Sequence, residues 1–191
     1  MDFELTEEHK QFRGEVEAFL KEALPPDWDE RVFGWPGAYG SMPHVEEEFR
    51  DFVRDFQRKA GQRGWHSLGW PERHGGQGSW MKQAIVVDTM DYHRAPLGGV
   101  ADAIAAPTIL AVASEEMKRQ WLPRIARGEI GFWLGYSEPN AGSDLASIRT
   151  TAVDEGDHFV VNGQKIWSTG AHVMNYAWIG VICDFFRNAI F

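Results

Sequence analysis

The feature that most restricts the fold of this chain is a change in the spacing of its apolar residues at Gly131. Before this glycine, apolar side chains recur every three or four residues, as on one face of an α-helix. After it, they form short runs separated by glycine, asparagine and aspartate, which is typical of β-strands and turns. We therefore expect an α+β fold, with an all-α N-terminal helical domain over residues 1–130 and a partial antiparallel β domain over residues 131–191.

Capping residues mark the starts and ends of the predicted helices. Thr6, Ser79 and Ser114 each precede a periodic apolar segment and can accept a hydrogen bond from the first helical turn. Gly128 favours the end of the last helix, and Pro123 is expected to interrupt it because proline lacks a backbone N–H. Residues 64–78, dense in Gly, Trp, Pro and His, are predicted to form an ordered loop. The predicted helices cover residues 6–24, 45–60, 79–94, 98–113 and 114–128.

The second part of the chain predicts strands and one tight hairpin. Strands are expected over residues 131–137, 148–153 and 177–183. The strongest turn signal is Asn162-Gly163, because both residues tolerate the positive φ of a type I′ turn. It predicts a hairpin between residues 158–161 and 164–168.

Charge and cysteine content exclude several classes of function. The formal net charge of −9 provides no basic surface for a nucleic acid or an anionic membrane. No apolar run approaches the ~18 residues of a membrane span, and the acidic N-terminus does not resemble a signal peptide. Cys183 is the only cysteine, so neither an intramolecular disulfide nor a multi-cysteine metal site is expected. We expect a cytoplasmic protein with no metal site, no nucleic-acid partner and no membrane insertion.

Two segments of the second part combine hydroxyl groups with turn residues. Residues 137–144 follow a predicted strand, so Ser137 and Ser143 can face a polar ligand or a phosphate, although composition alone favours an ordinary turn. Trp167 is followed by two hydroxyl residues, and a flat ring beside hydroxyls can cover a planar heterocycle. Taken by itself, this tryptophan is better interpreted as a core residue.

Other kinds of site lack support in the sequence. His66 and His74 do not have a spacing typical of metal ligands. No Gly-x-Gly-x-x-Gly follows a predicted strand, and no nucleophile elbow is present. Neither a Rossmann nucleotide site nor a hydrolase serine is therefore predicted.

Four ordered motifs, taken together, resemble the acyl-CoA dehydrogenase family. The segment GYSEPNAGSDL followed by VNGQKIWST is similar to the flavin-binding signature of that family. The helix that contains WLPR resembles the last helix before the family's β domain, and WPERHGG resembles its Gly-Gly loop. These motifs lie at residues 70–76, 115–129, 135–145 and 161–169, and the resemblance covers about residues 3–181.

The resemblance implies an FAD site between a middle β domain and a C-terminal four-helix domain. Ser137 matches a hydroxyl that hydrogen-bonds the flavin near N5 and O4, and Trp167 matches an aromatic wall beside the ring. Gly142 and Ser143 match positions that approach the flavin pyrophosphate and the acyl-CoA, so Ser143 is also a predicted substrate contact. The implied cofactor-binding residues are Leu134, Gly135, Tyr136, Ser137, Gly142, Ser143, Trp167, Ser168 and Thr169.

The reaction implied by the resemblance is α,β-dehydrogenation of an acyl-CoA thioester to a 2-enoyl-CoA. FAD accepts the hydride, and an electron-transfer flavoprotein is the expected electron acceptor, or oxygen in oxidase relatives. The family's base is a carboxylate of the C-terminal domain, and no carboxylate of this chain matches it.

The resemblance also fades near residue 182. We therefore expect a fragment or frameshifted product that is inactive alone, and a homo- or hetero-oligomer at full length. The alternative is a short, non-catalytic subunit that binds a partner chain.

Overall fold

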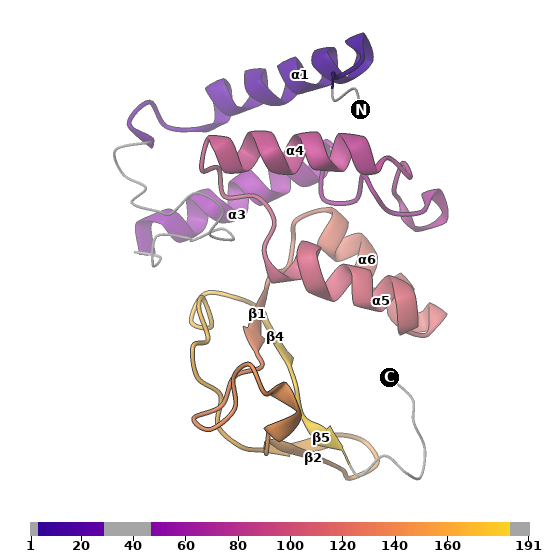
Figure 1. The fold of residues 1–191 in the computed structure, drawn as a ribbon, viewed down its shortest axis with the longest axis vertical. Coiled ribbons are helices and arrows are strands. Elements are labelled where there is room, and N and C mark those ends of the chain that lie inside the picture. Colours follow the sequence, from indigo (N-terminus) through magenta and orange to yellow (C-terminus); the bar gives the residue numbers. More distant parts are fainter. Residues whose placement is uncertain (1–3, 29–46, 184–191) are drawn as a thin grey trace.

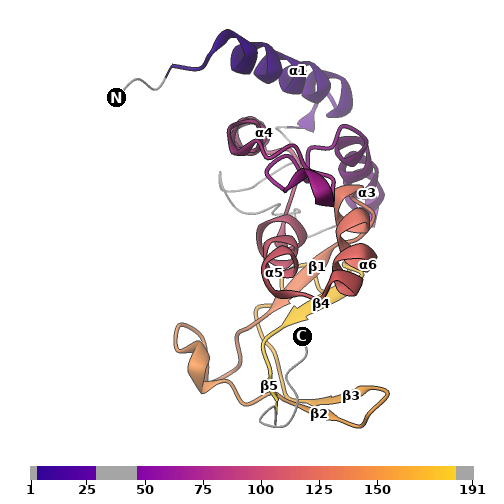
Figure 2. The ribbon, with the colours of Figure 1, turned by 90° about the vertical axis from the view of Figure 1, so that its right-hand side faces the viewer.

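The computed structural model describes residues 4–28 and 47–183 of the chain. Helices gather at one end of the molecule and strands at the other, with α5 and α6 lying between the other helices and the strands (Figure 1; Figure 2). The elements are α1 (Glu7–Ala23), α3 (Glu47–Gln62), η1 (Glu72–His74), α4 (Trp80–Tyr92), η2 (Ala101–Ala105), α5 (Ala106–Val112), α6 (Glu115–Ala126), β1 (Phe132–Gly135), η3 (Leu145–Ser147), β2 (Thr151–Asp154), β3 (Phe159–Asn162), β4 (Tyr176–Ile179) and β5 (Ile182–Cys183).

The three predicted N-caps are confirmed. The backbone N–H of His9 donates to the Thr6 hydroxyl at 3.3 Å, and the Ser79 and Ser114 hydroxyls accept from the first turns of α4 and α6. These bonds satisfy donors that would otherwise be unpaired at the helix starts. The predicted start of the second helix at residue 45 lies outside the described residues.

The expectation that Pro123 interrupts the last helix is wrong. Helix α6 continues through this proline to Ala126, because Leu122 and Ile125 on either side are each only 1% exposed and hold the backbone against the core. Gly128, with a φ of +62°, follows the helix end as predicted. The fourth predicted helix begins as a π-helix, η2, before it becomes α5.

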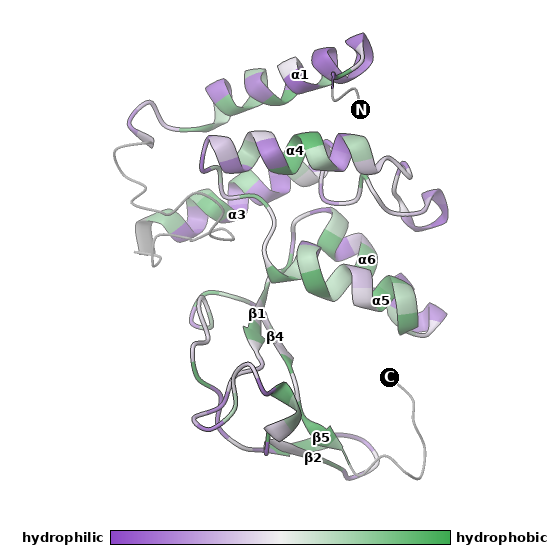
Figure 3. Cartoon of the chain, viewed as in Figure 1, coloured by the Kyte–Doolittle hydropathy of each residue, from purple (hydrophilic) through white to green (hydrophobic). Residues whose placement is uncertain are grey.

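Two apolar cores stabilise the helical end. The first joins α1, α3 and α4 around Phe56 and includes Trp65 from the loop after α3. The second joins α5, α6 and β1 around Leu122, and Trp70 extends into it from the same loop. Residues 64–78 are therefore ordered as predicted. In Figure 3 the apolar side of α1 lies toward α4 and its polar side faces outward.

The strands confirm the α+β class, but their pairing is mixed. Strand β1 pairs with β4 in parallel, β2 pairs with β3 antiparallel, and β2 pairs with β5 in parallel. The strand predicted over residues 177–183 is divided, since residues 180 and 181 separate β4 from β5.

The predicted hairpin at Asn162-Gly163 is wrong. Strand β3 pairs with the preceding strand β2, and the turn between them contains Gly156, which has a φ of +97°. Gly163 has no positive φ; a Cβ there would overlap the side chain of Thr150, so this glycine permits a close approach of two chain segments. Residues 164–168 are not part of a strand.

Among the helices of residues 4–28 and 47–183, none combines the length and apolar character required to cross a membrane. The same residues contain no group of three or more His, Cys, Asp or Glu side chains that could hold a metal ion.

Candidate functional site

A cavity of about 640 Å³ lies where the helical end meets the strands. Its walls come from α3, η2 and the segment before it, β1 and the loop that precedes β4. Six of the nine predicted cofactor-binding residues line it, namely Leu134, Tyr136, Ser137, Trp167, Ser168 and Thr169. The fold thus brings together two predicted segments that are separated along the chain.

The two segments are joined by their backbones. The N–H of Ile166 donates to the carbonyl of Ser137 at 3.0 Å, so the end of β1 lies beside residues 166–169. Ser137, Ser168 and Thr169 all line the cavity, and their hydroxyls make no side-chain hydrogen bond to any described residue. They are therefore available to a ligand in the cavity.

Trp167 is not a core residue. Its side chain is 84% exposed, and its φ of +57° lies in the left-handed region that non-glycine residues rarely adopt. Residues held in such rarely adopted backbone conformations cluster at functional sites. The structure therefore contradicts the interpretation of Trp167 as a core residue, and the ring can cover a flat ligand.

A buried ion pair fixes the loop after β1. Glu138 is 8% exposed, and its Oε1 accepts from Lys165 Nζ at 2.8 Å. The backbone N–H groups of Arg149 and Thr150 also donate to this carboxylate, at 2.7 and 2.9 Å. Hydrogen bonds from Lys165 and then from Thr150 lower the pKa of Glu138 to about 2. The carboxylate is thus ionised at neutral pH and holds the segment next to Ser137 in place.

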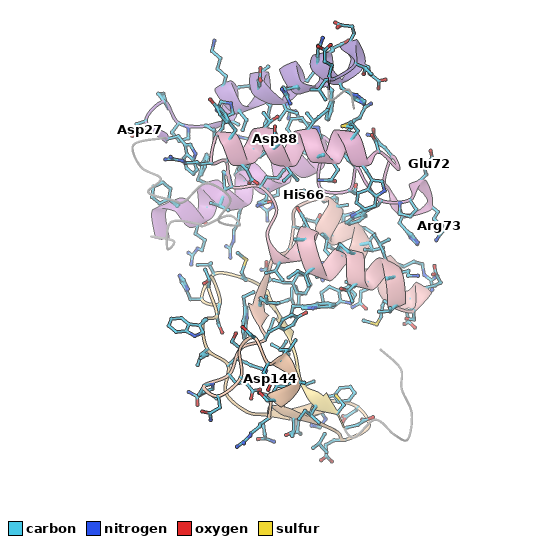
Figure 4. The ribbon with its side chains drawn as sticks, in the orientation of Figure 1. Asp27, His66, Glu72, Arg73, Asp88 and Asp144 are labelled. Atoms are coloured by element: carbon cyan, nitrogen blue, oxygen red, sulfur yellow. The ribbon has the colours of Figure 1, made fainter. Side chains whose placement is uncertain are left out.

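The remaining three predicted residues do not line the cavity. Gly135 is buried in β1, where a Cβ would contact Ile179 and Trp133. Gly142 and Ser143 are exposed on the loop that leads to η3, the region where Figure 4 labels Asp144. Their proposed contacts with the flavin pyrophosphate and the substrate stay predictions.

Sequence reasoning missed a polar pair in the cavity wall, the buried His66 and the partly buried Asp102. His66 Nδ1 lies 2.6 Å from Asp102 Oδ2, and His66 Nε2 lies 2.9 Å from the carbonyl of Gln57. Burial alone would lower the pKa of His66, but the charge and hydrogen bond of Asp102 raise it above its ordinary value. Figure 4 shows His66 in the interior, between α4 and α5.

This pair had no signal in the sequence. In the sequence His66 lies near His74, without a spacing typical of metal ligands. Its partner lies on η2, and helical periodicity does not reveal which buried carboxylate meets which imidazole.

The described residues fit a bound FAD. The cavity volume is in the usual range for cofactor sites, and its wall combines apolar side chains with free hydroxyls and one exposed tryptophan ring. Hydroxyl donors suit the polar edge of a flavin ring, and an aromatic face suits its plane.

Comparison with protein families identifies two matching regions. Residues 6–129 match the model of the acyl-CoA dehydrogenase N-terminal domain, and residues 134–185 match that of the acyl-CoA dehydrogenase middle domain.

Individual relatives agree with these matches. Acyl-CoA dehydrogenase FadE26 of Mycobacterium tuberculosis is 39% identical over 182 residues, which cover 95% of this chain and 44% of that protein. A chain of the ChsE4-ChsE5 complex of the same organism has a TM-score of 0.79 at 36% identity. The match covers 96% of this chain and 44% of that chain. The steroid acyl-CoA dehydrogenase Tcur3481-Tcur3483 has a TM-score of 0.80 at 35% identity, and the match covers 99% of this chain and 46% of that chain. The chain thus spans less than half the length of these relatives.

Proposed function

Because this chain belongs to the acyl-CoA dehydrogenase family, we propose that it forms the flavin-facing part of an enzyme that dehydrogenates acyl-CoA thioesters. Members of this family use FAD and act as oxidoreductases. The proposal assigns the same cofactor to this chain and the conversion of an acyl-CoA to a 2-enoyl-CoA to the complete enzyme. It keeps a domain boundary after residue 130, which the positions of the two family matches support.

The observation that carries the proposal is the position of Ser137, Trp167 and Thr169 around one cavity. Bound FAD would supply the acceptor for the hydrogen that leaves the β-carbon. The hydroxyls of Ser137 and Thr169 would donate to the polar edge of the flavin and stabilise negative charge there. Trp167 would cover the ring and exclude water from the reacting face. The ion pair of Glu138 and Lys165 would hold the segments that carry these side chains in position.

The base that removes the α-proton is not assigned to this chain. No carboxylate here matches the position of the family's base, so we propose that a different segment or a partner chain provides it. We therefore expect these 191 residues to be inactive alone and to function in a homo- or hetero-oligomer in the cytoplasm. An electron-transfer flavoprotein is the proposed electron acceptor.

A short, non-catalytic subunit is less consistent with the site. A partner-binding role does not require free hydroxyls and an exposed ring in one cavity. The family relatives include heteromeric complexes such as ChsE4-ChsE5, so association with a partner is compatible with either role.

Flavin binding by the purified chain tests the proposal. Titration with FAD, followed by the change in flavin fluorescence, should give saturable binding that is weaker in the Ser137→Ala variant. Ser147→Ala, on η3 outside the cavity lining, is the matched control and should bind FAD like the unmodified chain. Failure of the unmodified, folded chain to bind FAD would count against the proposal. Acyl-CoA oxidation by the chain alone would contradict the assignment of the base to another segment.

A further inference from the structure

The cavity wall contains a carboxylate that the proposed flavin site does not use. Asp102 lies on η2 among apolar wall residues that include Val100, Ala103 and Ile104. Its side chain is 19% exposed, and the residue lines the cavity. A charged group in a largely apolar wall is costly unless it is paired or bound by a ligand.

The orientation of Asp102 is fixed by His66. The imidazole side chain is only 1% exposed, and its two nitrogens face acceptors, namely Asp102 Oδ2 and the carbonyl of Gln57. Because both nitrogens face oxygens, the pair holds a proton between Nδ1 and Oδ2. The second oxygen, Oδ1, makes no hydrogen bond within the part of the chain that the structure describes. Whether the shared proton lies on Nδ1 or on Oδ2, Oδ1 can accept a hydrogen bond.

The other carboxylate of the described cavity lining is different. Both oxygens of Glu129 accept hydrogen bonds from Arg127, at 2.6 and 3.0 Å. Glu129 is therefore satisfied by the protein itself, whereas Asp102 keeps one oxygen available to a ligand.

Two glycines leave space around Asp102. A Cβ at Gly98 would lie 3.6 Å from Asp102 Oδ2, and Gly99, with a φ of +112°, has nothing within 4 Å of the corresponding position. The backbone before η2 therefore approaches the carboxylate without covering it with a side chain. Asp102 also lies within a π-helix, and such helical segments are frequent at functional sites.

We propose that Oδ1 of Asp102 accepts a hydrogen bond from a hydroxyl on the acyl group and thereby selects hydroxylated acyl-CoA thioesters. This inference rests on the proposed function, because it assigns a specificity-determining residue to the same cavity. An acyl chain without a donor would leave the carboxylate oxygen unpaired. The unpaired oxygen would weaken the binding of such a chain relative to its hydroxylated counterpart.

Ligand binding to the unmodified chain is the primary test. The FAD-loaded chain is titrated by calorimetry with straight-chain CoA thioesters in matched pairs that differ by one hydroxyl, moved along the acyl chain. We expect one hydroxyl position to bind about tenfold tighter than its unsubstituted partner, the factor typical of a hydrogen bond to a charged group.

Variants assign the preference to Asp102. Asp102→Ala should bind hydroxylated and unsubstituted thioesters equally, and Asp102→Asn should retain part of the preference because its amide keeps a carbonyl oxygen. Glu129→Gln, which changes the other carboxylate of the lining, should leave the preference unchanged. A general loss of packing would instead weaken binding of all the thioesters together, so the ratio within each pair distinguishes the two effects.

The outcomes separate this inference from the function on which it rests. Binding of FAD and of all the thioesters with equal affinity would overturn the role of Asp102 and leave the proposed function intact. Absence of both FAD and thioester binding by the folded chain would contradict the proposed function and the inference together.

Discussion

The ammonium group of Lys165 lies 2.8 Å from Oε1 of Glu138, and both side chains are less than one-tenth exposed. Lys165 also donates to the carbonyl of Tyr136, at 3.2 Å. The pair therefore connects the end of β1 to the segment that carries Trp167 and Thr169. These segments form two walls of the cavity. The ion pair therefore holds the site together without lining it.

The first prediction concerns stability at low pH. The pKa of Glu138 is about 2 in the folded chain, against 4.5 in the unfolded chain, chiefly because of Lys165. A lowered folded-state pKa contributes stability above pH 4.5 that is lost as the pH falls toward 2. The urea midpoint should therefore fall across this window, and less steeply in Glu138→Gln. An equal slope in the two proteins would show that other carboxyl groups control acid unfolding.

The second prediction concerns His66 at higher pH. Its folded-state pKa is raised above 6.5 by Asp102 despite the opposing effect of burial. A raised pKa contributes stability that is complete below pH 6.5 and is lost as the pH rises through the folded value. The thermal midpoint should decrease over this range, and the decrease should be smaller in Asp102→Asn. Ring nitrogen chemical shifts of His66 would locate the folded-state pKa directly, and a value at or below 6.5 would contradict the prediction.

The third prediction concerns Gly128. Its φ is +62°, and a Cβ there would overlap the carbonyl of Gln57 and lie 3.0 Å from His66 Nε2. Gly128→Ala should reduce the free energy of unfolding by about 2 kcal/mol, because it combines left-handed strain with a backbone clash. Gly14→Ala in α1 is the control: nothing lies within 4 Å of its Cβ position, so it should increase stability by about 0.5 kcal/mol. Urea unfolding of both variants is the measurement.

The fourth prediction separates binding from stability at Trp167. Because this ring is 84% exposed, Trp167→Ala should leave the thermal midpoint nearly unchanged. It should weaken FAD binding about fivefold, since an aromatic ring contact is worth roughly 1 kcal/mol. Trp80→Ala removes another exposed tryptophan, 74% exposed and outside the cavity lining, and should not affect FAD affinity. Equal affinity in both variants would contradict the assignment of Trp167 to the flavin site.

Local sequence signals were sufficient for the helices and for several of the cavity residues. Thr6, Ser79 and Ser114 act as caps because each hydroxyl accepts a hydrogen bond from an N–H only three residues away. The apolar spacing of each helix can likewise be recognised within that segment alone. The motif around Ser137 and Trp167 marked two segments that the fold brings to the same cavity.

Pairing between distant segments was decided by the tertiary structure alone. Asn162-Gly163 and the segment around Gly156 both suit a turn, and the choice between them depends on which partner β3 finds; it pairs with β2. His66 and Asp102 are separated by 36 residues, and Glu138 and Lys165 by 27. Periodicity and capping encode contacts between near neighbours. These pairs form only when several helices and strands have packed, because a polar group that becomes buried is destabilising unless it is paired.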